Sequence, residues 1–263
     1  MQCHTLFRQG QDGTFMTDGM GKAVAPHGTE KRAGPADDTE RSPVQKVVLP
    51  YEIPCGTEYY VASLAEIPAR PFYAFWKRFL DITVSWIGIF LFLPLMLLIG
   101  ILIRCTSPGP VFFLQDRVGL NGKKFRIIKF RTMCTDAEKG GARWSEGAED
   151  ERIYPFGRFL RRTRLDELPQ LWCCVIGTMS LVGPRPEREC FYVEFEKYIH
   201  GFRERTRVKP GITGLAQVSG GYDLRPEEKM RYDAEYIRKR SLRLDAALLL
   251  RTVKVILTGR GAK

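Results

Sequence analysis

The chain has 263 residues, a length that allows one or two domains. Lysine and arginine number 41 against 30 acidic residues, a formal net charge of +11, which predicts an anionic partner: nucleic acid, an anionic membrane surface or a phosphorylated substrate. The seven cysteines include no C-x-x-C pair and there are only three histidines, so the composition argues against a disulfide framework and against a zinc site.

Residues 1–70 are predicted to be an N-terminal extension that is largely disordered. The segment is rich in Gly and Pro and shows no sustained apolar periodicity. A chain of this composition cannot bury enough apolar surface to offset the entropy lost on ordering. The sequence assigns no function to this extension.

Residues 71–105 are predicted to be embedded in a membrane. The stretch 82–103 contains 22 consecutive residues without a charge. A straight helix of that length reaches about 33 Å, enough to cross a hydrocarbon core of roughly 30 Å. An aromatic and basic cluster that ends in Lys77 and Arg78 precedes it, and such clusters are typical of a membrane interface. Membrane lipid is therefore an expected partner.

The course of this helix depends on Pro94, in the middle of the apolar stretch. Proline removes a backbone hydrogen bond and bends a helix. Basic residues flank the stretch on both sides, so the positive-inside tendency draws both ends to the cytoplasmic face. A re-entrant helix hairpin bent at Pro94 satisfies both tendencies and is our prediction. A straight span is the alternative, because proline kinks are tolerated in true spans.

Residues 106–263 are predicted to form a small cytosolic catalytic domain. The stretches 111–118 and 123–133 have strand patterns and flank a Gly-Leu-Asn-Gly segment, whose Asn-Gly pair is a strong hairpin signal. A short extended run is expected at 215–218. Helical patterns cover residues 155–164, 165–176, 187–199, 226–240 and 242–257. The expected fold class is α+β, mostly helical, with a short β-hairpin.

Two adjacent carboxylates, Asp166 and Glu167, follow a basic run and begin the amphipathic segment 165–176. A structural interpretation is a helix start in which Asp166 caps and Glu167 complements the helix dipole. In a chemical interpretation, a carboxylate with a pKa of about 4 is ionised at neutral pH, so Asp166 could attack phosphorus without a separate base. Glu167 would then be a natural ligand for a magnesium ion that offsets the charge repulsion. Spacing alone does not assign these two roles.

Several basic side chains could hold the phosphates of such a substrate. The guanidinium fork binds phosphate oxygens through two parallel hydrogen bonds and never loses its charge. The candidates gather around Pro- and Gly-containing turns and the acid pair: Lys129, Arg131, Arg161, Arg164 and Arg185.

From about residue 75 to residue 257 the chain resembles the bacterial sugar transferases, the monotopic polyprenyl-phosphate phosphoglycosyl transferases. The resemblance rests on motifs that occur in order along the chain, and the complete series is specific where any single motif is weak. The motifs begin at Lys77 (KRFLD), Ser107 (SPGPVFF), Gln115 (QDRVG), Lys129 (KFRTM), Leu165 (LDELPQL), Met179 (MSLVGPRP) and Lys209 (KPGITG).

This resemblance implies a two-step exchange. Asp166 matches the family's nucleophilic aspartate, which would attack the sugar-bearing phosphate of a UDP-sugar and release UMP. The phosphate of undecaprenyl phosphate would then attack the covalent phosphosugar-aspartyl intermediate and form a lipid-linked diphosphosugar. Glu167 matches the glutamate that binds magnesium. Such reactions start the assembly of exopolysaccharide, capsule, O-antigen or glycoprotein glycans.

The resemblance also implies positions for substrate binding and for the membrane. Basic positions near the phosphates are matched by Lys129, Arg131 and Arg161. The nucleotide-sugar site is matched by Arg185, Pro186, Gly211 and Gln217.

The family's re-entrant helix bends at a Ser-Pro pair, and this chain has Leu93-Pro94 there, so the proline is kept and the serine is not. The implied location is the bacterial inner membrane, with the catalytic domain on the cytoplasmic face. We expect the short form of the family, without an additional multi-span region. The resemblance leaves room for a homo-oligomer and for downstream glycosyltransferases as partners, and no nucleic acid is expected.

Three other functions compete with this one. A membrane-anchored protein that binds anionic lipid or nucleic acid accounts for the charge and the apolar helix, but not for the acid pair. A catalytically silent scaffold of polysaccharide assembly would have no need of that pair. A conventional glycosyltransferase would release UDP in place of UMP.

Overall fold

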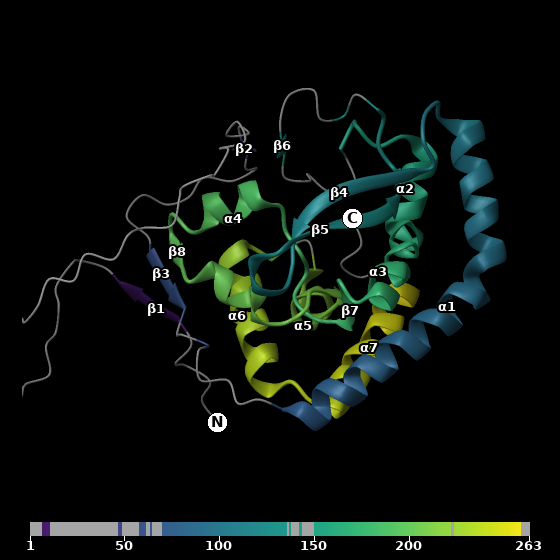
Figure 1. Cartoon of the computed structure of the whole chain (residues 1–263). Helices are drawn as coiled ribbons and strands as arrows, with labels where there is room; N and C mark the ends of the chain where they lie inside the picture. Colours follow the sequence, from purple (N-terminus) through teal and green to yellow (C-terminus); the bar gives the residue numbers. More distant parts are fainter. Residues whose placement is uncertain are drawn as a thin grey trace, which may run out of the picture.

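The computed structural model describes most of the chain after residue 70 and short pieces before it (Figure 1). The described residues are 7–10, 47–48, 58–61, 64, 70–135, 137, 142–143, 150–221 and 224–258. The predicted disorder of the N-terminal extension therefore falls for the most part outside the described residues.

The longest element is helix α1, Pro71–Thr106, with 36 residues and Pro94 in its interior. It is one continuous helix that is visibly bent (Figure 1), so the chain does not reverse direction as two antiparallel helices would. The predicted apolar helix and the proline within it are confirmed; the re-entrant hairpin is not. By length and composition α1 could cross a membrane.

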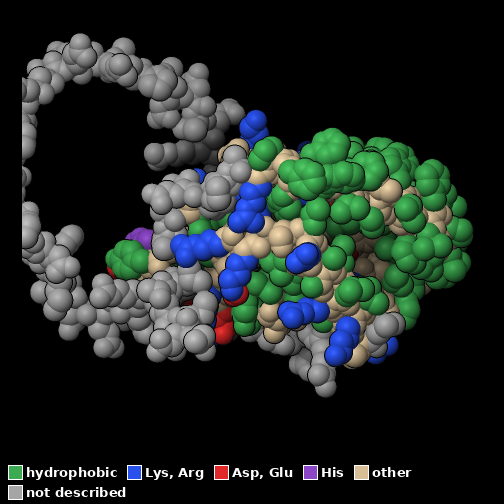
Figure 2. Space-filling view, turned by 90° about the horizontal axis from the view of Figure 1, so that it is seen from below, with side chains coloured by type: hydrophobic (Ala, Val, Ile, Leu, Met, Phe, Trp, Pro, Cys, Tyr) green, Lys and Arg blue, Asp and Glu red, His purple; other side chains and the backbone are tan. Residues whose placement is uncertain are grey.

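Most of the surface of α1 is apolar and uncovered. Sixteen of its large hydrophobic side chains are exposed, and Figure 2 shows hydrophobic side chains gathered at that end of the molecule. Four buried side chains attach the helix to the rest of the chain: Asp81, Ser85, Ile99 and Ile103.

Both halves of α1 pack on the same domain. In the first half, Asp81 Oδ1 accepts hydrogen bonds from Ser180 Oγ and from the Leu181 N–H, each 3.0 Å long. In the second half, Ile99 and Ile103 belong to a buried apolar cluster with Phe130 and Leu160. The apolar helix is thus held at each end while its bend is left uncovered.

Lys77 and Arg78, predicted at the membrane interface, direct their charges into the domain. Lys77 Nζ lies 2.8 Å from Asp245 Oδ2. The Arg78 guanidinium donates to the carbonyls of Cys174 (2.6 Å) and Val175 (2.7 Å), near the C-terminal end of a short helix. Carbonyls at a helix end have no partner within the helix, so a cation there is stabilised.

The predicted β-hairpin is confirmed. Strands β4, Phe112–Val118, and β5, Lys124–Phe130, pair antiparallel in the register Phe113↔Lys129. They are joined through a turn, η1 (Leu120–Gly122), in which Asn121 takes the left-handed conformation with φ 53°. Asn and Gly tolerate positive φ better than other residues, which is why this pair turns the chain.

The remaining helices lie between and after short strands, and the domain is mostly helical, as predicted. They are α2 (Pro155–Arg162), η3 (Leu165–Glu167), α3 (Gln170–Ile176), α4 (Glu189–Phe195), η4 (Phe202–Arg207), α5 (Leu215–Ser219), α6 (Pro226–Lys239) and α7 (Leu242–Thr258). The extended run predicted at 215–218 is wrong, because that segment is α5. The continuous helix predicted over 165–176 is also wrong, because η3 and α3 are separate elements.

Strands β7, Ser180–Val182, and β9, Gly211–Thr213, form a parallel pair. Gly183 and Gly211 touch there: a Cβ on Gly211 would lie 2.1 Å from the Gly183 nitrogen. Only glycine permits such a close approach of two backbones.

Part of the predicted extension joins the domain. Strand β3, Glu58–Val61, pairs with β1 (Phe7–Gly10) and with β8 (Ile199–His200), and β2 (Val47–Val48) pairs with β6 (Ala142–Arg143). Leu64 is buried in the main apolar cluster. The boundary at residue 70 therefore separates the extension by composition and not by packing.

Candidate active site

The acid pair lies on the turn η3, between α2 and α3. Arg164, just before it, has φ 59°, a left-handed conformation that is uncommon for residues other than glycine. This residue ends α2 and turns the chain, so Asp166 and Glu167 precede the next helix instead of lying on its surface. Both side chains are buried, with relative exposures of 7% and 6%.

Glu167 is held by two cations. Its Oε1 accepts from Lys129 Nζ at 3.0 Å and from Arg185 Nη2 at 2.6 Å. Burial by itself favours the neutral carboxyl, but the charges of Arg185 and Lys129 outweigh it and hold the pKa of Glu167 well below its usual value. Glu167 is therefore ionised at neutral pH.

Asp166 has a different environment from its neighbour. Burial raises the pKa of Asp166 to about 6; the positive charge of Lys129 opposes this shift, and the negative charge of Glu167 adds to it. At neutral pH the carboxylate still predominates, as an attack on phosphorus requires.

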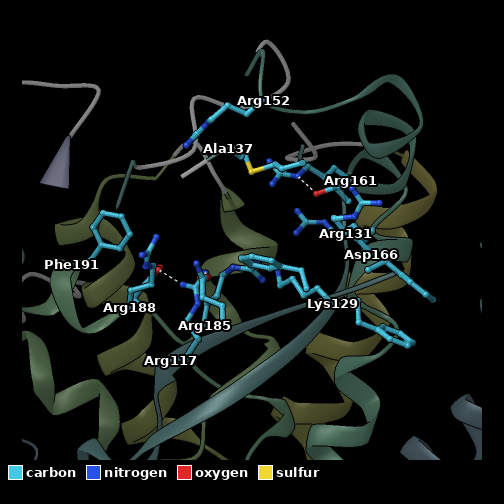
Figure 3. A pocket seen from close by; sticks show the side chains of 18 of the residues that line it. Arg117, Lys129, Arg131, Ala137, Arg152, Arg161, Asp166, Arg185, Arg188 and Phe191 are labelled. Carbon is cyan, nitrogen blue, oxygen red and sulfur yellow. Dashed lines mark hydrogen bonds and ion pairs between the residues drawn. The ribbon is translucent and has the colours of Figure 1, made fainter. Parts of the chain in front are cut away.

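Asp166 lines a cavity of about 380 Å³ (Figure 3). Ten basic side chains line it against two acidic ones, so the cavity is suited to a polyanion. Seven of the residues predicted from the sequence line this cavity: Lys129, Arg131, Arg161, Arg164, Asp166, Arg185 and Gln217. In Figure 3, Asp166 and Lys129 lie toward one end of the cavity, with Arg188 and Phe191 toward the other.

Arg131 has its donors directed at one turn. Nε donates to the Pro110 carbonyl (2.6 Å), Nη1 to Ser107 Oγ (2.9 Å) and the Pro108 carbonyl (2.8 Å), and Nη2 to the Ser107 carbonyl (2.8 Å). With 4% exposure, this side chain organises the turn that follows α1. Arg161 is less buried than Arg131, and its Nε donates to Thr132 Oγ1 at 2.9 Å.

Gln217, predicted in the nucleotide-sugar site, has a side-chain amide without hydrogen-bond partners in the described part of the chain. Its amide oxygen and nitrogen are both buried, and neither has a hydrogen-bond partner among the described residues. Buried polar atoms without partners are costly, so a cavity-lining amide of this kind is suited to a ligand. Pro186 and Gly211 do not line the cavity: the Pro186 carbonyl accepts from Arg117 (3.2 Å), and Gly211 packs on Gly183.

The cavity is also lined by residues that the sequence did not propose for the site. They include Arg117, Glu187, Arg188, Phe191, Arg205 and Lys229. Arg117, Arg188 and Phe191 lie toward the end away from Asp166 (Figure 3). Arg117 stands within the QDRVG motif, and alternation along β4 places it on the same face as Phe113; that signal could have identified it. The others come from the segment just before α4, from α4 itself, and from η4 and α6. No local sequence pattern predicts that these elements meet.

The residues of the acid pair fit a magnesium ion only if substrate phosphates supply further ligands. Among the described residues no group of three or more His, Cys, Asp or Glu side chains could hold a metal. Magnesium is commonly bound by one or two carboxylates together with substrate phosphates and water, and an adjacent ionised pair meets that need. The acid pair could therefore take up the ion together with a phosphorylated substrate.

Comparison with known proteins gives a consistent picture. The chain matches the family model described as bacterial sugar transferase over residues 72–259. It is 44% identical over 204 residues to a UDP-N-acetylgalactosamine-undecaprenyl-phosphate N-acetylgalactosaminephosphotransferase of Aeromonas hydrophila, with 76% of this chain and 48% of that protein covered.

Two further relatives carry related names. One is a UDP-glucose:undecaprenyl-phosphate glucose-1-phosphate transferase of Xanthomonas campestris pv. campestris, 44% identical over 169 residues, covering 62% of this chain and 35% of the relative. The other is a putative undecaprenyl-phosphate N-acetylgalactosaminyl 1-phosphate transferase of Bacillus subtilis (strain 168), 42% identical over 173 residues, covering 66% and 86%. The chain thus spans less than half the length of the first two relatives and most of the third.

Proposed function

Because the chain belongs to the bacterial sugar transferase family, we propose that it transfers a phosphosugar from a UDP-sugar to undecaprenyl phosphate and releases UMP. The observation that carries the proposal is the position of Asp166: an ionisable carboxylate in a cavity lined by ten basic side chains. The substrate classes follow the names of the relatives. The product would begin the membrane-bound assembly of a polysaccharide or glycoprotein glycan.

The first step forms a covalent intermediate. An Asp166 oxygen attacks the sugar-bearing phosphorus, the bond from that phosphorus to the UMP oxygen breaks, and UMP leaves with the electron pair. Lys129, Arg161 and Arg185 offset the negative charge that gathers on the phosphates, and they are already in place when the substrate arrives. Their fixed positions reduce the reorganisation that the step would require in water.

The second step regenerates the carboxylate. An oxygen of undecaprenyl phosphate attacks the same phosphorus, the bond from phosphorus to Asp166 breaks, and the lipid-linked diphosphosugar departs. Each attack proceeds in line with the bond that breaks. The acceptor phosphate therefore takes the position that the UMP phosphate has vacated, and the same cations serve both steps.

Glu167 has a supporting role in this scheme. It orients Lys129 and Arg185, to which it is bonded at 3.0 and 2.6 Å, and it would hold the magnesium ion together with the substrate phosphates. When bound, the ion neutralises phosphate charge and polarises the phosphoryl oxygens.

We also propose that α1 enters the membrane from the cytoplasmic side and returns to it. The two ends of α1 pack on one domain, with Asp81 at one end and Ile103 at the other, while the side chains around Pro94 are uncovered. A straight span would place one of those ends, with its packed domain contacts, on the far side of the bilayer. The basic residues on both flanks of the apolar stretch support the proposal that this side is the cytoplasmic face of the bacterial inner membrane.

Release of UMP tests the reaction. The full chain in detergent, with magnesium and undecaprenyl phosphate, is given UDP-glucose, UDP-galactose or UDP-N-acetylgalactosamine in turn. We expect UMP from at least one donor and a loss of about a thousandfold or more in Asp166→Asn, which removes the nucleophile.

The matched control is Asp116→Asn, the same change at an exposed carboxylate 3.4 Å from Arg126 on the hairpin. Wild-type rates are expected for this variant. UDP in place of UMP would indicate a conventional glycosyltransferase, and a folded protein that releases neither would favour a scaffold or a lipid-binding protein.

A further inference from the structure

The cavity changes in polarity along strand β4. Alternate residues of a strand share a face, and the residues of β4 that project along one face into the cavity are Phe113, Gln115 and Arg117. Leu114 and Asp116, between them, do not line it, although Phe112 at the start of the strand does. One strand therefore lays out an apolar, a neutral polar and a cationic side chain in sequence, over roughly 13 Å.

The apolar end of the strand is the end nearest to α1. Helix α1 ends at Thr106, and β4 begins at Phe112 after the turn that Arg131 holds. At this junction the cavity is lined by Pro110, Phe112 and Phe113, which we call the membrane-side arm. Phe112 and Phe113 are 47% and 40% exposed, so the arm opens to the surface beside the uncovered apolar helix.

The membrane-side arm also adjoins the acid pair. Phe113 is the direct cross-strand partner of Lys129, and side chains so paired lie about 5 Å apart at their Cβ atoms. Lys129 in turn binds Glu167, next to Asp166. The arm thus joins the uncovered apolar surface at one end and the cations around the nucleophile at the other.

We propose that the membrane-side arm is the acceptor subsite and holds the first isoprene units of the polyprenyl phosphate during the second step. This inference rests on the proposed function. The acceptor's chain remains in the bilayer while its phosphate reaches the position that UMP has left, so its first units must cross the space between the two. The arm lies along that route and offers apolar contact, with cations at the inner end for the phosphate.

The opposite end of the cavity suits the other substrate. Arg117 and Arg188 lie there with the aromatic ring of Phe191 (Figure 3), a set that fits a nucleotide and not a hydrocarbon. The two substrates would then approach Asp166 from different ends of one cavity and share only the phosphate position.

The test separates the two steps in the full-length protein. UMP release without acceptor reports the first step, and transfer from the preloaded enzyme to undecaprenyl phosphate reports the second. Phe113→Ser is compared with Leu114→Ser, an apolar-to-serine change at the next residue, which is 51% exposed against 40% for Phe113 and does not line the cavity.

In Phe113→Ser we expect the second step at subsaturating acceptor to slow about tenfold, with less than about a twofold change in the first step, because apolar contact with the lipid is lost. Leu114→Ser should change both steps less than about twofold. Phe113→Leu, which keeps an apolar side chain, should recover most of the second step.

Chain length gives an independent measurement. The wild-type protein should use undecaprenyl phosphate better than geranyl phosphate. Because both acceptors carry the first isoprene units, Phe113→Ser should slow transfer to each of them by a similar factor. Equal losses in the Phe113 and Leu114 variants would indicate general membrane contact and overturn the subsite. A slower first step in Phe113→Ser would assign the arm to the donor sugar. A normal second step in Phe113→Ser would refute the acceptor subsite but not the proposed function. A wild-type protein that completes neither step would refute the proposed function itself.

Discussion

Two pairs of basic side chains around the same cavity have opposite surroundings. Lys129 and Arg185, the acid-facing pair, point at one carboxylate beside Asp166 and keep side-chain exposures of 16% and 21%. Arg131 and Arg205, the internal pair, are 4% and 2% exposed. A cation whose donors are taken by backbone carbonyls or a buried partner holds the fold together, whereas one beside an ionised carboxylate at a cavity can serve chemistry.

Arg205 is tied to the fold through one of its three nitrogens. Nη2 lies 2.6 Å from Asp233 Oδ2 and donates to the Arg185 carbonyl at 2.9 Å, whereas Nε and Nη1 are buried and have no hydrogen-bond partner among the described residues. It therefore also fixes the backbone of the turn that presents Arg185 to Glu167. The comparison predicts that changes to the internal pair act first on stability and changes to the acid-facing pair act first on rate.

The largest effect is expected for Arg205→Met. This change leaves Asp233 buried without its cation, and the free energy of unfolding should fall by about 3–5 kcal/mol. Chemical denaturation of the detergent-solubilised protein measures it. The double variant Arg205→Met with Asp233→Leu removes both charges and should recover much of the loss. A stability loss below about 1 kcal/mol in the single variant would mean that the ion pair does not hold this region.

Arg185→Gln is expected to act on rate. Removing one of the two cations on Glu167 also removes charge stabilisation from the phosphate site, so kcat/KM for UMP release should fall about a hundredfold, equivalent to about 2.7 kcal/mol. The free energy of unfolding should change by less than about 1 kcal/mol, since Lys129 still pairs with Glu167. A destabilisation as large as that of Arg205→Met would place Arg185 with the internal pair.

Arg131→Lys should be smaller and should act on stability. The guanidinium makes four hydrogen bonds to Ser107, Pro108 and Pro110, and an ammonium group cannot reproduce that fork. A loss of about 2 kcal/mol is expected in the free energy of unfolding, with UMP release by the folded protein reduced less than in Arg185→Gln. The reverse order would show that Arg131 contacts the phosphates directly.

Arg126→Gln is expected to have the smallest effect on stability and on UMP release. Arg126 pairs with Asp116 at 3.4 Å, and both side chains are about two-thirds exposed, at 66% and 68%. Surface pairs of this kind contribute little, so the change in free energy of unfolding should stay within about 0.5 kcal/mol and UMP release should be unaffected. Any larger effect would reveal a role for this face of the hairpin that the structure does not indicate.

The sequence predicted the parts of the fold whose causes are local. An uncharged run of 22 residues between basic flanks can be recognised as a membrane helix, and an Asn-Gly pair between alternating strands can be recognised as a hairpin. Membership of the family was also predicted from the sequence, because an adjacent acid pair among arginines and Pro-Gly turns occurs in the order that the family shows. These features depend on residues close together along the chain.

Tertiary structure decided the features that depend on distant residues. Residues 215–218 were predicted to be extended, yet they form α5, whose packing on α6 and α7 no short pattern contains. The same reason explains why β3 was missed: its partner β8 lies about 140 residues further along the chain.

The division between the two pairs of cations has the same origin. Composition supplies 41 lysines and arginines but does not say which will meet a carbonyl, a carboxylate or water. Arg131 and Lys129 are two residues apart in the sequence. The Arg131 guanidinium binds the turn after α1, and the Lys129 ammonium group binds Glu167 after α2. Only the folded positions of that turn and of the acid pair distinguish the two roles. The sequence by itself predicted an anionic partner and a chemistry for it. The packing of the chain's elements determined where that partner would bind, because electrostatic roles depend on the partners and burial that only the folded chain provides.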